Sequence, residues 1–60
     1  MTLTIHRDAG RILARGDGHD LAVLSRSPHG LRVAWIGTGP WSSWLELGII
    51  EAFERWELAQ

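Results

Sequence analysis

Three clusters of turn-forming residues divide the first 37 residues into four short segments. The stretches "RDAGR", "GDGHD" and "SPHG" combine glycine with aspartate, proline or histidine, a composition typical of tight turns. Before the first of them, "TLTIH" alternates threonine with apolar residues, which is the period of a half-buried strand. The segments "RILAR", "LAVLSR" and "LRVAWIG" lie between and after the turns as further strands. The sequence therefore predicts an antiparallel meander with strands at about 2-7, 11-15, 21-27 and 31-37.

The first and third turns set the expected register of the two outer strand pairs. In "DAG" and "PHG" two residues precede a glycine, the arrangement of a three-residue hairpin loop that ends in a residue with positive φ. Such loops place Ile5 opposite Leu13, and Val23 opposite Trp35.

The middle turn presents two conflicting signals. A two-residue Asp17-Gly18 turn is the strongest local signal, but it places Leu13 and Val23 on opposite faces of the sheet. A loop with an odd number of residues, such as 17-19, keeps these two side chains together. We expect the odd loop, because a register slip moves every side chain of a strand to the wrong face.

This register predicts one core face and one open face. The core face would carry Leu3, Ile5, Leu13, Leu21, Val23, Leu31, Val33 and Trp35. The open face would still hold several apolar residues, which makes a cluster around Ile12, Leu24 and Ile36 a candidate contact surface. The alternative is that these are singly exposed aliphatic residues of an ordinary surface.

A helix is predicted for residues 43-58. Ser43 and Glu46 have the spacing of a capping box, and a broad apolar stripe follows at helical spacing, formed by Leu45, Gly48, Ile49, Ala52, Phe53 and Trp56. Gly48 indicates a close approach to a strand or to a tryptophan, because glycine inside a helix costs roughly 1 kcal/mol relative to alanine. We expect an α+β fold in a single domain, 1-60: a four-stranded antiparallel β-meander followed by one C-terminal helix packed on one face of the sheet.

The other side of this helix is acidic and partly apolar. Glu54 and Glu57 lie near the helix C-terminus, where a negative charge opposes the helix dipole, so stability alone does not account for them. We interpret this side as a partner-binding surface, formed by Glu46, Leu47, Ile50, Glu51, Glu54, Glu57 and Leu58. The alternative is a solvated face that tolerates a few aliphatic residues.

The sequence offers few groups for catalysis or metal binding. The absence of cysteine excludes disulfides and thiolate metal sites. Asp17, His19 and Asp20 lie in one short loop without a distant fourth ligand, and turn formation explains them as well. There is no serine with an evident base beside it, and a chain of 60 residues leaves little volume for a pocket. We expect no enzymatic activity, no cofactor and no metal.

The charges are divided unevenly along the chain. Residues 1-37 hold five arginines and three aspartates, whereas residues 38-60 hold four glutamates and one arginine. A nucleic-acid-binding β-ribbon that uses Arg7, Arg11, Arg26 and Arg32 is therefore an alternative function. It is less favoured, because the chain has a net charge of −1 and nucleic-acid-binding domains normally carry a clear basic excess.

These observations predict a small non-enzymatic protein-binding module. An acidic helix face can occupy a partner's basic surface that is shaped for phosphate, so we expect an inhibitor or modulator of a nucleic-acid-handling protein. Inhibitors of phage or mobile-element type, such as anti-CRISPR proteins, are a class suggested by size alone. A homo-oligomer formed through an exposed apolar sheet or helix face is a second expectation. We expect a cytoplasmic protein without membrane contact, because the sequence shows no export signal and no long apolar run.

Overall fold

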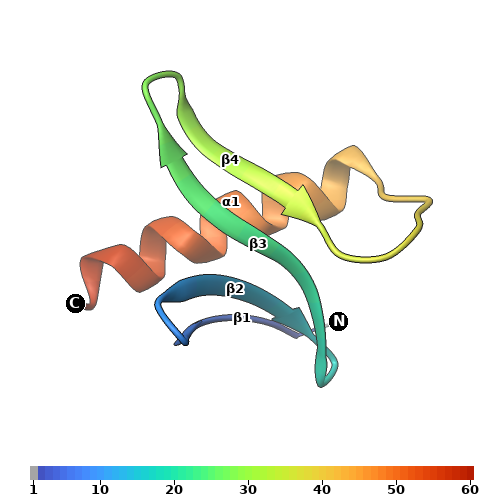
Figure 1. The fold of residues 1–60 in the computed structure, drawn as a ribbon, viewed down its shortest axis with the longest axis horizontal. Coiled ribbons are helices and arrows are strands. Elements are labelled where there is room, and N and C mark those ends of the chain that lie inside the picture. The colour runs from blue at the N-terminus through green and yellow to red at the C-terminus, as the bar shows by residue number, and fades with distance from the viewer. Residues whose placement is uncertain (1) are drawn as a thin grey trace.

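The computed structural model describes residues 2-60, which form one antiparallel sheet and one helix. The strands follow one another in the order β1-β2-β3-β4, and Figure 1 shows the helix α1 extending along one face of the twisted sheet. The predicted α+β class is confirmed. The element bounds are β1 Leu3–Asp8, β2 Arg11–Gly16, β3 His19–Ser27, β4 Gly30–Trp35 and α1 Ser43–Leu58.

The first and third turns are one residue shorter than the sequence predicts. Asp8 lies opposite Arg11, so the β1-β2 loop contains only Ala9 and Gly10, at φ 51° and 78°. Two successive residues with positive φ are the signature of a type I′ turn, whose twist matches that of the flanking strands.

At the third turn, Ser27 lies opposite Gly30. The Ser27 hydroxyl donates to the Gly30 carbonyl oxygen at 2.9 Å and accepts from the His29 amide at 3.3 Å. These bonds close a two-residue loop, so the prediction of three-residue loops at both turns was wrong.

The middle turn satisfies both of its conflicting signals. Asp17 and Gly18 form a two-residue turn at φ 50° and 83°, and Leu13 nevertheless lies opposite Val23. A β-bulge in β3 reconciles the two-residue turn with this pairing. Leu21 is an extra residue of β3, between two residues that each have a partner on β2. Because one extra residue moves the rest of the strand to the opposite face, it brings Val23 back opposite Leu13. The pairing of Leu13 with Val23 is confirmed, whereas the odd loop was wrong.

The shorter turns reverse the expected faces of β2 and β3. The residues that pack with the helix are Leu3, Ile5, Ile12, Ala14, Ala22, Leu24, Leu31, Val33 and Trp35. The predicted core face is therefore correct for β1 and β4, but Leu13 and Val23 lie on the open face, away from the helix, where Leu13 is nevertheless buried. A one-residue change in loop length moves a whole strand to the opposite face, and two such changes return β4 to its predicted side.

The predicted contact surface around Ile12, Leu24 and Ile36 does not exist as one surface. Ile12 packs against the core and Leu24 is buried within it. Ile36 follows β4 and remains 41% exposed.

The helix buries the stripe that its sequence predicts. Ile49, Ala52 and Phe53 are buried, while Leu45, Gly48 and Trp56 are half-buried beside them. The cap differs from the prediction by one residue: the Ser42 hydroxyl accepts from the Leu45 amide at 3.0 Å. Ser42 rather than Ser43 is the N-cap, so the predicted capping box is not formed, and Glu46 is an acidic residue of the first turn.

Candidate protein-binding surface

The side of α1 opposite the sheet carries large apolar side chains among carboxylates. Trp44 is 83% exposed, Leu47 50% and Leu58 87%. Glu51 and Glu54 are exposed on the same side, because positions separated by three, four or seven residues share a face of a helix. We call this surface the outer helix face, and it consists of Trp44, Leu47, Glu51, Glu54 and Leu58.

The structure divides the predicted partner-binding residues into two groups. Leu47, Glu51, Glu54 and Leu58 belong to the outer helix face. Ile50 and Glu57 are half-buried on the flank that faces the β3-β4 hairpin. Glu46 is exposed in the first turn.

Sequence reasoning missed Trp44, the most informative residue of the outer helix face. Trp44 precedes Leu47 by three residues and Leu58 by fourteen, so helical spacing alone places all three on one side. The predicted helix, 43-58, already contains Trp44, so the signal is present in the sequence, although the predicted outer side of that helix omits Trp44. Tryptophan is among the residues most often found at the energetic centre of protein interfaces.

A groove separates the C-terminal half of α1 from the β3-β4 hairpin. It has a volume of about 250 Å³ and is lined by Arg26, Gly30, Leu31, Ile50, Phe53, Glu54 and Glu57. Arg26 forms an ion pair with Glu57, and its guanidinium lies 5.6 Å from the centre of the Phe53 ring. The groove therefore has an apolar floor and one carboxylate already paired with a cation.

The four arginines of the alternative nucleic-acid-binding function do not share a surface. Arg7 lies on the helix side, where its guanidinium is 5.5 Å from the centre of a Trp56 ring, and Arg26 contacts the same helix. Arg11 and Arg32 alternate with core residues of their strands and so belong to the open face. This division does not form the continuous basic stripe that grips phosphates.

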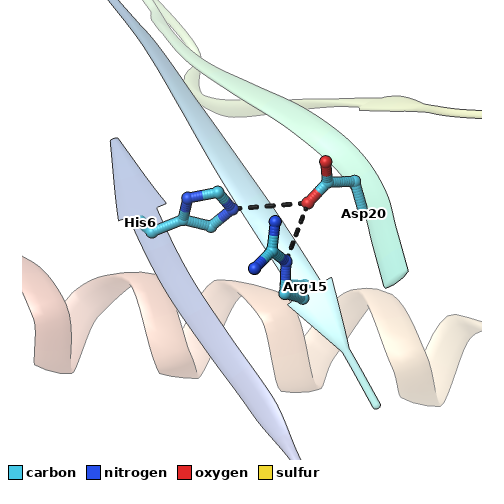
Figure 2. A network of polar contacts seen from close by, with 3 residues as sticks. All are labelled: His6, Arg15 and Asp20. Carbon is cyan, nitrogen blue, oxygen red and sulfur yellow. Dashed lines mark hydrogen bonds and ion pairs between the residues drawn. The ribbon is translucent and has the colours of Figure 1, made fainter. Parts of the chain in front are cut away.

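Three polar side chains join neighbouring strands on the open face (Figure 2). One oxygen of Asp20 on β3 accepts from Arg15 Nε on β2 at 3.1 Å and lies 3.3 Å from His6 Nε2 on β1. The hydrogen bond from Arg15 is the largest effect on the pKa of Asp20 and lowers it below its ordinary value of 3.8. Desolvation opposes this effect in part, and the hydrogen bond with His6 lowers the pKa by a smaller amount. The network connects β1, β2 and β3 at the exposed surface, which indicates a structural role.

Residues 2-60 contain neither a cluster of metal-ligating side chains nor a membrane-spanning helix. In this range no three histidine or carboxylate side chains lie close enough together to hold a metal ion. The helix is also too short and too polar to cross a membrane.

Comparisons with other proteins add no assignment. The chain matches no protein-family model, and neither a curated protein nor a solved structure shows significant similarity to it.

Proposed function

We propose that this chain is a non-enzymatic protein-binding module that docks through the outer helix face. The observation that carries the proposal is the exposure of Trp44, Leu47 and Leu58, at 83%, 50% and 87%, on one side of a single helix. Burying such side chains is favourable by roughly 25 cal/mol per Å² of apolar area, and a helix with aromatic and leucine anchors is a common docking element.

The charges of the outer helix face select a basic partner. Glu51 and Glu54 lie between the apolar anchors, and Glu46 adds a third exposed carboxylate in the first turn. The exposed Arg55, four residues after Glu51, offsets one of these three charges, so the exposed part of the helix keeps a net charge of −2. Glu57 contributes less, because Arg26 already neutralises it. Carboxylates arranged in this way attract arginine- and lysine-rich surfaces and accelerate association with them.

A basic surface that binds nucleic acid is the partner that fits this chemistry best. Phosphates and carboxylates compete for the same cations, so a bound acidic helix excludes the nucleic acid. We therefore propose an inhibitor or modulator of a nucleic-acid-handling protein, the function that phage and mobile-element inhibitors such as anti-CRISPR proteins perform.

Affinity capture from the native host, with matched variants, tests the docking surface. Wild-type protein is compared with the W44A/L47S/L58S variant and with an I36S control, which changes an exposed residue outside α1. We expect wild type and I36S to retain the same partner and the triple variant to lose it. Retention by all three proteins would contradict the proposal.

Competition with nucleic acid tests the inhibitory role. With the captured partner purified, adding the wild-type chain should displace bound nucleic acid in proportion to occupancy, and W44A/L47S/L58S should not. A ternary complex of chain, partner and nucleic acid would contradict inhibition while leaving the docking surface in place.

Self-association through the same surface is the competing outcome. Light scattering after size exclusion separates the two, because a dimer that the triple variant abolishes assigns the outer helix face to a second copy of the chain.

A further inference from the structure

We propose that the groove between α1 and the β3-β4 hairpin binds an arginine side chain of the basic partner. This inference rests on the proposed function and deepens it, because the groove adjoins the outer helix face at Glu54. The partner would place this arginine next to the apolar residues of the outer helix face.

The shape and lining of the groove suit a side chain with an apolar stem and a charged end. Leu31, Ile50 and Phe53 supply the apolar lining of a space of about 250 Å³. Arginine buries its aliphatic stem along apolar surface while its guanidinium remains at the edge. An uncharged apolar ligand could fill the groove, but it would form no ion pair with Glu54 at the groove's edge.

The charge balance of the groove selects a cation. Glu54 and Glu57 contribute two carboxylates and Arg26 one guanidinium, and the ion pair between Arg26 and Glu57 neutralises that part of the lining. Glu54 is exposed, and in residues 2-60 no ion pair involves it. An incoming cation therefore meets one net negative charge at the groove's edge.

The chain itself contains an example of the proposed contact. Arg26 places its guanidinium 5.6 Å from the centre of the Phe53 ring and pairs with a glutamate of the next helical turn. A planar guanidinium combines a cation–π contact with a hydrogen-bonded carboxylate. A second guanidinium would pair with Glu54 while its stem packs on Leu31 and Ile50, whereas a lysine ammonium is more strongly hydrated and cannot form two parallel hydrogen bonds to one carboxylate.

Titration with small arginine probes tests the groove without the partner. Nα-acetyl-arginine amide is added to the isotope-labelled full chain, and NMR shifts are followed at Leu31, Ile50, Phe53 and Glu54. Nα-acetyl-citrulline amide, which has the same shape and no charge, is the matched neutral probe, and Nα-acetyl-lysine amide compares the two cations. We expect saturable shifts at the groove with the arginine probe, weaker shifts with lysine, and smaller ones at high salt because of screening.

Two carboxylate variants make the assignment specific. E54Q should weaken binding of the arginine probe roughly two- to fivefold, the usual range for one exposed ion pair. D8N removes an exposed carboxylate of β1 outside the groove and should leave binding unchanged. Equal binding of arginine and citrulline, or equal effects of E54Q and D8N, would overturn the inference, and the comparison of probes on wild type holds even if a variant misfolds.

The two proposals fail separately. If W44A/L47S/L58S loses the partner while the arginine probe does not bind the groove, the docking surface stands and the groove assignment falls. If the probe binds as expected but the triple variant retains the partner, the proposed docking surface falls instead.

Discussion

Gly48 of α1 lies directly against Leu3 of β1: a Cβ atom added at Gly48 would be 3.0 Å from Leu3 Cδ1. The sequence indicated a close approach at this glycine, and the neighbour is an edge strand of the sheet. The contact involves the tip of a flexible, half-buried side chain rather than backbone.

We therefore predict that G48A is mildly stabilising. Alanine gains up to about 1 kcal/mol of helix propensity, and displacement of the Leu3 tip removes part of it, so the free energy of unfolding should rise by about 0.5 kcal/mol. Urea denaturation measures the change. In an L3A background the same substitution should gain more, and an equal or smaller gain there would show that Leu3 does not oppose the added methyl group.

The reversed faces of β2 and β3 predict different tolerance at two alanines. Ala22 is fully buried beneath the helix, so A22L should lower the free energy of unfolding by about 1–3 kcal/mol through overpacking. Ala34 is exposed and lies opposite Val23 on the open face, so A34L should change it by less than about 0.5 kcal/mol. Denaturation of both variants distinguishes the observed register from the one predicted from the sequence. If A22L were as stable as wild type, Ala22 would lie on the open face, as the sequence predicted.

Two tryptophans near the start of the helix should differ sharply in their contribution to stability. Trp41 stacks on Trp35 with ring centroids 4.9 Å apart and an angle of 8° between the planes. Stacking contributes about 0.5–1.5 kcal/mol beyond burial, so W41A should cost roughly 1–3 kcal/mol in all.

Trp44 is 83% exposed, and W44A should leave the free energy of unfolding within about 0.5 kcal/mol of wild type. Thermal denaturation and acrylamide quenching of tryptophan fluorescence test this pair. A large loss of stability in W44A would contradict its assignment to a free docking surface.

The His6–Arg15–Asp20 network predicts a loss of stability in acid. Because the folded-state pKa of Asp20 lies below the ordinary value of 3.8, its stabilising effect is complete above that value and is lost as the pH falls through the lowered pKa. D20N should therefore reduce the difference in urea midpoint between neutral pH and acid.

The order of the two contributions to this pKa can also be measured. The Arg15 hydrogen bond is the largest cause and His6 a smaller one, so R15A should raise the pKa of Asp20 more than H6A does. An NMR titration of the Asp20 carboxyl carbon provides the values. A larger effect of H6A would show that the imidazole rather than the guanidinium holds the carboxylate.

The amino-acid sequence by itself determined the kinds of elements and their order. Glycine-containing turn clusters mark the ends of the strands because few residues adopt positive φ without strain. The 3.6-residue period from Leu45 to Trp56 identifies the buried stripe of α1, because it follows from helix geometry whatever the sheet does.

Only the tertiary structure decided which side chains of β2 and β3 meet that helix. The choice depends on one residue in each of two loops and on the bulge at Leu21, and a turn sequence such as "RDAGR" is compatible with a two-residue or a three-residue loop. Packing resolves them, because small residues such as Ala14 and Ala22 let the helix approach the sheet. The groove beside Glu54 depends on the same packing, since the hairpin and the helix that form it are distant in sequence and meet only in the folded chain.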